Sequence, residues 1–457
     1  MMGTTRRGAF KDDDLVELAD EYNIAQFASF SPGPQPQPRH LRVSDPTEPG
    51  TGDPLEAAIE LVLRRSAGTV NVRSFRPESP KGNPFRYGID SAAEAAAAVR
   101  RLAADGYHTI VNETIDVKDG GVSGVALGEV VEFSPLATPR AVEKPGAAAL
   151  PLELAHRLLR TVYGFAPRIP PTDHQRIEFS IHPLRVGLHH EHTIIWETGQ
   201  DIGASRPLAS WPNNFSRFIG DKVYGLLVAD AVGLPVPAAT AVGRNVAPFR
   251  FGRSTGTNET WLRTCPFEQV PGRYRTQKGW TDPYALLGAE DPTGKVLVSV
   301  LAQESVAATY SGASSPIADA PDLVEGVAGH GDRFMLGDLA PQPLPPGVVA
   351  DVRALTDLAR HELGPVRIEW AHDGRQAWVL QLHVATEVAH HAVLSAGDPA
   401  GGWVDFDPSE GLSELERLVE RARVGQLGVV LTRPVGYTSH IGDLLRRAGV
   451  PGRFLAG

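Results

Sequence analysis

The chain has 457 residues, of which 42% are hydrophobic and 21% charged, a composition that excludes a globally disordered protein. Its 44 basic against 54 acidic residues give a net charge of −10, which argues against a protein that binds nucleic-acid backbones. The single cysteine, Cys265, excludes an internal disulfide and a metal site built from several cysteines.

The N-terminal part is predicted to precede the first folded unit. Residues 1–23 lack the apolar core of a signal peptide, and residues 31–54 are rich in Pro, Gly and Ser, which is typical of a linker. We therefore expect residues 1–54 to form an N-terminal segment and linker. No stretch approaches the roughly 20 apolar residues of a membrane span, so we expect a cytoplasmic protein without a membrane partner.

Residues 55–200 are predicted to alternate helices with strands. A helix is expected from Pro54 to Arg65, where the apolar residues share one face behind a first-turn proline. A second helix is expected between a Ser91 cap and Gly106. This alternation predicts an α/β (α+β) fold. The further predicted elements are strands at 69–75, 107–117, 122–135, 176–183 and 192–197 and a helix at 152–164.

Three segments of residues 201–394 carry charges that suit a nucleotide phosphate. Lys222 begins a predicted helix, where its charge and the free backbone N–H groups favour phosphate oxygens. Arg263 lies on a predicted strand, and a buried arginine there needs an anionic partner. The basic loop 271–280, which contains the candidate nucleotide contact Thr276, is either a phosphate lid or an exposed hairpin.

Polar residues at the end of a buried strand suit a nucleotide base. Gln303 and Glu304 end the apolar strand that leads to Val306. Their donors and acceptors match the pattern that an adenine edge requires.

A predicted hairpin at 366–383 brings two oxygen-bearing side chains together. It turns at Asp373-Gly374, and alternation along its arms lets Glu369 and Gln381 share a face. Such a pair suits Mg²⁺ beside a triphosphate, and the alternative is a cross-strand polar pair without a ligand.

The order of motifs in residues 55–200 recurs in residues 201–394. We therefore expect two related units in tandem. The first unit shows no counterpart of Lys222 and is expected to be a degenerate scaffold or substrate platform. The matching residues are Arg73 and Arg263, Asn112-Glu113 and Gln303-Glu304, Glu178 and Glu369, and Glu197 and Gln381.

Taken in order, the motifs of residues 215–385 resemble the ATP-grasp domain of the phosphoenolpyruvate synthase and pyruvate, phosphate dikinase family. They are GDKVYG…GLPVP, WLRT, AQESV…YSGA, VEGVAGHGD, RIEWAHDG and VLQLH. The resemblance implies two ATP-grasp-like units with ATP and Mg²⁺ as cofactors. His383 stands where the family has an arginine, which implies weaker neutralisation of phosphate charge. The implied contacts are Lys222 and Arg263 to phosphates, Gln303 to Val306 to adenine, and Glu369 and Gln381 to metal and phosphate.

The C-terminal residues 395–457 are expected to form a hinge, at 395–411, and a truncated phosphohistidine-like unit. The stretch PVGYTSHIGDLLRRAGVP resembles the phosphohistidine segment of the same family, which implies that His440 is the catalytic nucleophile. A histidine at a helix N-terminus is held neutral near pH 7, so that a ring nitrogen is free to attack. The alternative is a histidine that caps or packs.

The resemblance implies an ATP-dependent, dikinase-like phosphotransferase. It would pass a phosphate from ATP through His440 to an unidentified small-molecule or protein acceptor and release AMP. One alternative is an ATP-grasp ligase that forms an acyl phosphate and releases ADP. The other alternative is a non-catalytic nucleotide-binding protein.

Overall fold

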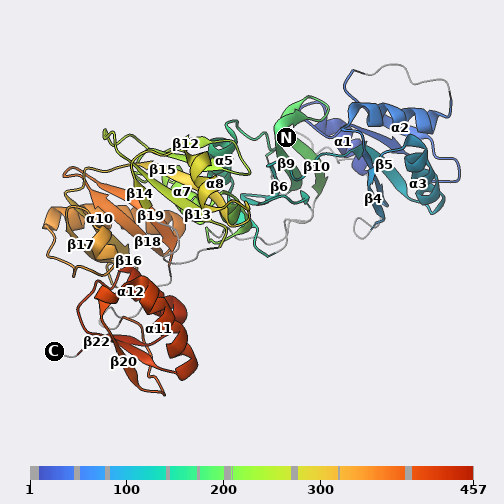
Figure 1. Ribbon diagram of the computed structural model, residues 1–457. Coiled ribbons are helices and arrows are strands. Elements are labelled where there is room, and N and C mark those ends of the chain that lie inside the picture. Colours follow the sequence, from blue (N-terminus) through green and yellow to red (C-terminus); the bar gives the residue numbers. More distant parts are fainter. Residues whose placement is uncertain are drawn as a thin grey trace. The chain divides into compact units, whose positions relative to one another are not determined.

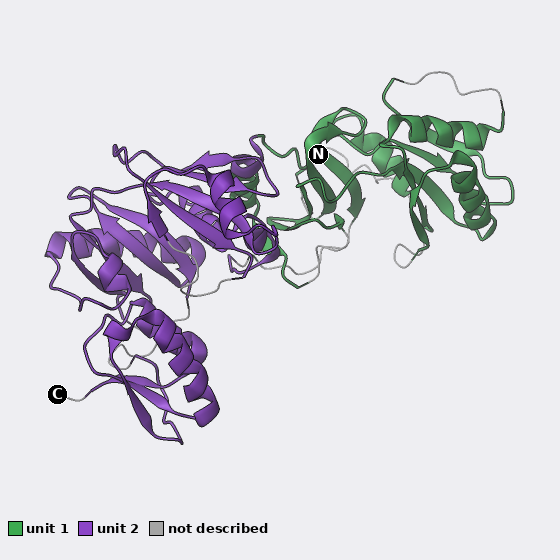
Figure 2. Ribbon diagram, in the orientation of Figure 1, with its two compact units in different colours: residues 1–159, 165–208 green, residues 160–164, 209–457 purple. Residues whose placement is uncertain are grey.

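The computed structural model describes residues 10–45, 52–77, 83–139, 145–171, 175–199, 207, 209–268, 276–317, 320–385 and 394–455. The chain divides into two compact units, residues 1–159 with 165–208 (unit 1) and residues 160–164 with 209–457 (unit 2), as Figure 2 shows. Helices and mostly antiparallel sheets confirm the predicted α+β class. None of the described helices is long and apolar enough to cross a membrane.

The first sheet of unit 1 has the strand order β2–β1–β5–β3–β4, and all neighbours are antiparallel. Figure 1 labels β4 and β5 of this sheet beside helices α2 and α3. Helices α2 and α3 share one apolar core with the sheet, in which Ala28, Ile59 and Val111 are fully buried. Ser91 caps α3 as predicted, and α2 begins at its predicted first-turn proline behind the cap Asp53. The elements are α1 (Lys11–Leu18), β1 (Phe27–Phe30), β2 (Pro38–Arg42), α2 (Pro54–Arg65), β3 (Val70–Phe75), β4 (Phe85–Ile89), α3 (Ala92–Ala104) and β5 (His108–Glu113).

The expected linker at 1–54 differs from the structure. Residues 10–45 form α1, β1 and β2, and the buried strand β1 pairs with β5 inside the sheet. Of the predicted linker 31–54, residues 31–37 form the loop between β1 and β2, and residues 46–51 lie outside the described residues. Pro38 begins β2 at the sheet edge, where its missing N–H costs little.

The second sheet of unit 1 has the order β10–β9–β6–β7–β8, again antiparallel. The predicted strand 122–135 is a hairpin, because Gly128 takes a positive φ of 59° that allows the chain to turn there. Strands β5 and β6 belong to different sheets, so residues 118–121 are no hairpin turn. The elements are β6 (Val122–Leu127), β7 (Val130–Pro135), β8 (Ala148–Pro151), α5 (Leu152–Tyr163), β9 (Arg176–Val186) and β10 (Glu191–Gly199).

Unit 2 begins with two helices and an antiparallel sheet of order β12–β11–β15–β13–β14. Nearly all of α7 is buried, in keeping with its apolar sequence. The elements are α6 (Asn214–Ile219), α7 (Asp221–Ala231), β11 (Ala239–Gly243), β12 (Phe249–Phe251), β13 (Thr260–Pro266), β14 (Thr276–Lys278), α8 (Pro283–Glu290) and β15 (Leu297–Glu304).

The second sheet of unit 2 has the order β17–β16–β18–β19. The predicted hairpin is present, with β18 and β19 joined at residues 373–376 and Glu369 opposite Gln381. The elements are β16 (Tyr310–Ser315), β17 (Leu323–Ala328), α9 (Asp332–Met335), α10 (Pro346–Leu363), β18 (Val366–His372) and β19 (Ala377–Val384).

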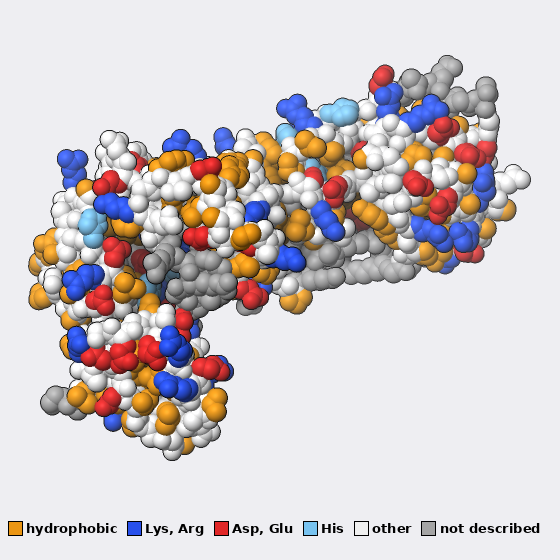
Figure 3. Space-filling model, in the orientation of Figure 1, with side chains coloured by type: hydrophobic (Ala, Val, Ile, Leu, Met, Phe, Trp, Pro, Cys, Tyr) orange, Lys and Arg blue, Asp and Glu red, His pale blue; other side chains and the backbone are white. Residues whose placement is uncertain are grey.

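The C-terminal part of unit 2 has its own small core around a parallel sheet of order β20–β21–β22. The predicted hinge at 395–411 is instead built into this body, since it contains β20 and Ser395 pairs with Gly452. Figure 3 shows acidic and basic side chains interspersed on its visible face. The elements are β20 (Trp403–Phe406), η1 (Pro408–Glu410), α11 (Leu412–Gly425), β21 (Gly428–Leu431), α12 (His440–Ala448) and β22 (Gly452–Phe454).

Candidate functional site

A narrow cavity lies between the two antiparallel sheets of unit 2. It measures about 90 Å³, whereas sites for drug-sized ligands measure ~300–1,000 Å³. The cavity is therefore smaller than a nucleotide and would have to widen to admit one. Trp261, His330 and Trp370 contribute ring surfaces to the wall. The structure brings five of the predicted nucleotide residues to this cavity: Arg263, Gln303, Glu304, Val306 and Glu369.

The guanidinium of Arg263 is held at the base of the cavity. Arg263 Nη1 donates to Gln303 Oε1 over 2.5 Å. Burial lowers the pKa of Arg263, while the charges of Glu369 and Asp332 oppose that shift. A buried cation without a direct carboxylate partner suits an anionic ligand.

Two buried polar atoms beside Arg263 lack a partner. Glu369 Oε1 and Gln303 Nε2 are both inaccessible to solvent and make no hydrogen bond among the described residues. Such atoms cost free energy unless a ligand, ion or water completes them. Burial alone would raise the pKa of Glu369, but the charge of His440 when it is protonated, and the charge of Arg367, hold this pKa below its usual value. An ionised carboxylate with a free oxygen fits Mg²⁺, and a free amide N–H fits an adenine acceptor.

Four polar side chains form a block on β18 and β19. Glu369 pairs with Gln381, and Arg367 pairs with His383, two residues away on the same face. Gln381 does not line the cavity, and its Oε1 lies 3.1 Å from His383 Nε2. Burial lowers the pKa of His383 to about 4, so it is neutral at pH 7.

Lys222 lies in the first turn of α7, as predicted, but outside the wall of the cavity. No hydrogen bond or ion pair of Lys222 occurs in the described part of the chain, and its charge acts on His440 and Cys265. The preceding Gly220 has φ 100°, and a Cβ there would lie 2.6 Å from Cys265 Cβ. Only glycine fits this turn, which presents the positive end of α7 beside Lys222.

Two further predicted nucleotide contacts are Thr276, which does not line the cavity, and Glu304, which does. Thr276 is exposed and pairs with Arg263 across β13 and β14, and residues 271–275 of the predicted lid lie outside the described residues. The carboxylate of Glu304 accepts hydrogen bonds from Ser254 Oγ at 3.0 Å and from Thr255 N at 2.9 Å. Glu304 therefore lines the cavity with its acceptors already engaged.

His440 is the first residue of α12, behind the cap Ser439. Burial lowers its pKa, and the charges of Arg367 and Lys222 lower it further, while Glu369 and Asp443 oppose the shift. The neutral imidazole expected from its place at a helix start agrees with this direction. His440 thus shares one electrostatic cluster with the predicted phosphate and metal residues.

Two anchors hold the histidine turn against the second sheet. Arg367 Nη2 donates to Thr438 O over 2.5 Å, and Arg367 Nη1 lies 3.4 Å from Asp443 Oδ2. Glu325 Oε2 accepts from both Thr438 N and Thr438 Oγ1, each over 2.8 Å. The turn before His440 is therefore fixed by charged hydrogen bonds on both sides.

Sequence reasoning missed Arg367, Asp332 and Glu325. Alternation on β18 was the available signal for Arg367, because it places this residue on the face of Glu369. Asp332 begins the short helix α9 and lines the cavity. Glu325 contacts Thr438 through tertiary packing between segments that are distant in the sequence, so no local sequence pattern predicts this contact.

A second cavity of about 500 Å³ borders His383. Its wall combines the aromatic residues Trp211 and Phe267 with charges of both signs. The charged residues are Arg217, Arg447, Asp221 and Glu268. The hairpin of strands β18 and β19 thus contributes to both cavities, with Glu369 in the wall of the first and His383 in the wall of the second.

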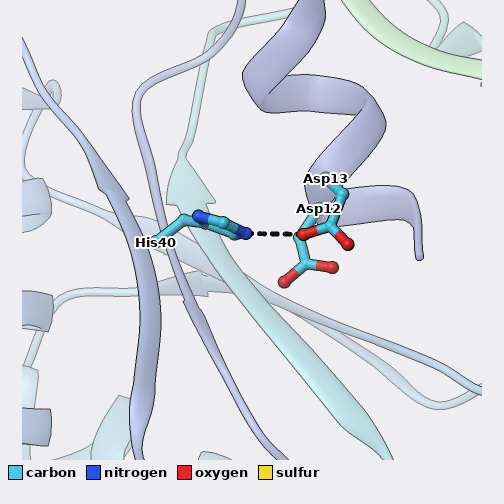
Figure 4. A group of neighbouring side chains, drawn as sticks. All are labelled: Asp12, Asp13 and His40. Atoms are coloured by element: carbon cyan, nitrogen blue, oxygen red, sulfur yellow. Dashed lines mark hydrogen bonds and ion pairs between the residues drawn. The ribbon is translucent and has the colours of Figure 1, made fainter. Parts of the chain in front are cut away.

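Unit 1 contains an acidic cluster that is already neutralised. Asp12, Asp13 and His40 bring their ligand atoms within 4.8 Å of one another (Figure 4). Arg39 donates to Asp12 Oδ2 over 2.8 Å and to Asp13 Oδ1 over 2.9 Å. The guanidinium supplies the positive charge that a metal ion would bring, so the cluster is a structural ion pair.

No family model and no curated protein matches the sequence. Among solved structures, the chain is similar to D-alanine-D-alanine ligase from Helicobacter pylori at 8% identity and a TM-score of 0.26, over 37% of this chain and 52% of that one. It is also similar to the D-cycloserine synthetase DcsG at 13% identity and a TM-score of 0.23, over 42% and 62%. The chain thus spans less than two thirds of either structure, and similarity this low carries no argument about function.

Proposed function

We propose that unit 2 is an ATP-grasp-like unit that binds ATP with Mg²⁺ between its two sheets. The observation that carries the proposal is the pair of unpartnered buried atoms, Glu369 Oε1 and Gln303 Nε2, beside the cation Arg263. The base would lie against Gln303 and Val306. The phosphates would meet Arg263 and Lys222, since both cations lack a carboxylate partner at hydrogen-bond distance among the described residues.

We propose that Glu369 holds the metal ion, with Gln381 as its neighbour on β19. Mg²⁺ there would offset charge on the phosphates. Lys222 and Arg263 would stabilise the charge that develops during transfer, helped by the N-terminus of α7.

The neutral imidazole of His440 is the proposed nucleophile. A ring nitrogen forms a bond to the β-phosphorus, and the bond from that phosphorus to the oxygen shared with the α-phosphate breaks, so AMP leaves and His440 carries the β- and γ-phosphates. Water would then attack the γ-phosphorus and break its bond to the oxygen shared with the β-phosphate, so inorganic phosphate leaves and one phosphoryl group stays on His440. Burial and the charges of Arg367 and Lys222 keep the lone pair of His440 free. The unidentified acceptor, a small molecule or a protein, would then take the phosphate.

The product of ATP use tests this chemistry. The protein with ATP and Mg²⁺ is expected to form AMP and an acid-labile phosphate on His440, and His440→Ala is expected to abolish both while ATP affinity stays nearly unchanged. His361→Ala is the matched control, because His361 is an exposed histidine in the last turn of α10. Undiminished AMP formation by His440→Ala would rule out the histidine route.

The second candidate is a ligase that uses the same ATP site. His383 in place of the family's arginine favours it, because the neutral ring offers less charge to a phosphate in transit. A ligase activates a carboxylate as an acyl phosphate without a histidine and releases ADP. Formation of ADP that depends on an added carboxylate and persists in His440→Ala would select this reaction. Absence of ATP–Mg²⁺ binding in calorimetry would remove both candidates and favour a non-catalytic protein.

A further inference from the structure

The two units have the same strand order in their paired sheets. The first sheets run β4–β3–β5–β1–β2 in unit 1 and β14–β13–β15–β11–β12 in unit 2. The second sheets run β10–β9–β6–β7 and β19–β18–β16–β17, with β8 added at the edge in unit 1. All of these neighbouring strands are antiparallel, so the orders can be compared residue by residue.

The pairing registers coincide at the candidate site. Arg73 lies opposite Ile110, two residues before Asn112, and Arg263 lies opposite Leu301, two residues before Gln303. In the second sheets, Glu178 pairs with Glu197 as Glu369 pairs with Gln381. Both of these pairs sit beside a bulge that skips one residue of β10 or β19.

Unit 1 also carries a lysine at the matching helix start. Lys11 is the first residue of α1, which precedes β1, and Lys222 is the second residue of α7, which precedes β11. The expectation that the first unit has no counterpart of Lys222 is therefore corrected. Lys222 follows a glycine turn at Gly220, whereas Lys11 is followed by three aspartates and has no glycine two residues before it. The sequence comparison therefore missed Lys11 as the counterpart.

The cations of unit 1 are occupied by a carboxylate of the same unit. Lys11 Nζ forms an ion pair with Glu197 Oε1, and Arg73 Nη2 lies 3.2 Å from Glu197 Oε2. The side chains of Lys11, Arg73 and Glu197 are only 15–19% exposed. Unit 2 has the uncharged Gln381 at the position of Glu197, and no such pairs form there among the described residues.

We propose that Glu197 takes the place of a nucleotide phosphate in unit 1, which is thus a latent polyphosphate site closed by its own side chain. The inference rests on the proposed ATP site of unit 2. Replacing Glu197 by the glutamine that unit 2 carries removes the competing anion and leaves a side chain of similar size. Lys11 and Arg73 are then available to phosphate oxygens.

Calorimetry of the full chain with ATP–Mg²⁺ tests this inference. The wild type is expected to bind one equivalent and Glu197→Gln two, with the new site lost again in Lys11→Gln/Glu197→Gln. Glu178→Gln is the matched control, because it removes a carboxylate of the same strand pair and leaves Glu197 on its cations. If the wild type binds one equivalent, one equivalent in Glu197→Gln at intact fold would overturn the inference, and so would two equivalents in the wild type.

Amide hydrogen exchange of the wild type gives a second measurement that needs no variant. Saturating ATP–Mg²⁺ is expected to protect α7, β13 and β18 and to leave α1, β3 and β9 unchanged. Protection of both sets would overturn the inference. If the wild type binds no ATP, the proposed function of unit 2 fails. A single site gained by Glu197→Gln would in that case still support the latent site.

Discussion

Units 1 and 2 place the same kinds of side chain at matching positions of their sheets. The two units differ in the groups that pair with the cations. In unit 1, Glu197 neutralises Lys11 and Arg73. In unit 2, Gln381 carries no charge. Among the residues that the structure describes, Arg263 donates to the amide oxygen of Gln303, and Glu369 keeps a buried oxygen without a hydrogen bond. At this strand position a carboxylate engages two cations in unit 1, whereas the carboxamide of unit 2 contacts His383 and engages no cation among the described residues.

The largest expected effect concerns the proposed metal ligand. Glu369→Ala is expected to lower ATP consumption on the order of 100-fold or more, because Mg²⁺ would lose its ionised oxygen ligand. Glu178→Ala, at the matching position of unit 1, is expected to leave the rate unchanged. ATP turnover assays on both variants check this, and equal losses at intact fold would break the assignment of the site to unit 2.

The next largest effect is expected on ATP affinity when the helix-start lysines Lys222 and Lys11 are replaced. Lys222→Met is expected to weaken ATP binding by about 10–100-fold, since it removes a phosphate cation at the start of α7. Lys11→Met is expected to leave the ATP affinity of the wild-type site unchanged. Calorimetric titration measures both affinities. A weaker affinity in Lys11→Met would show that unit 1 takes part in nucleotide binding.

Lys11→Met is instead expected to destabilise unit 1. The variant leaves the part-buried carboxylate of Glu197 with one cation fewer, which costs about 1–3 kcal/mol of unfolding free energy. Arg64→Met is the control, because its exposed pair with Glu60 contributes under about 1 kcal/mol. Denaturant unfolding measures the free energy of unfolding of both variants. Equal losses in Lys11→Met and Arg64→Met would show that the pair of Lys11 with Glu197 does not stabilise unit 1.

The smallest expected effects are opposite pH dependences of the two units. Burial lowers the pKa of His383 to about 4 from 6.5, so the unfolded chain binds the proton first and unit 2 loses stability as pH falls from 6.5 towards 4. Burial raises the pKa of Glu113 to about 7 from 4.5, so the folded chain binds the proton first and unit 1 loses stability as pH rises from 4.5 to 7.

Hydrogen exchange resolved by unit, over pH 4–7.5, checks these slopes. His383→Gln is expected to flatten the slope of unit 2 alone, and Glu113→Gln that of unit 1 alone. If the stability of a unit depends on pH as before after the substitution in that unit, another group causes the pH dependence.

Local patterns predicted much of the fold and part of the site. Helix α2 begins and ends where its first-turn proline and apolar face predict, and alternation predicted that Glu369 and Gln381 share a face. The four-residue strand β1 was missed, because it is too short to stand out beside a Pro/Gly-rich loop. The anchoring of Thr438 by Glu325 was not predictable, since it depends on packing between distant segments.

The most direct test of the central claim is a structure of the protein with Mg²⁺ and a non-hydrolysable ATP analogue. The account predicts the nucleotide between the two sheets of unit 2, with phosphates at Arg263 and Lys222 and the metal ion on Glu369. It also predicts that Glu197 stays on Lys11 and Arg73 in the same crystal. A nucleotide in unit 1, with Glu197 displaced from those cations, would contradict it.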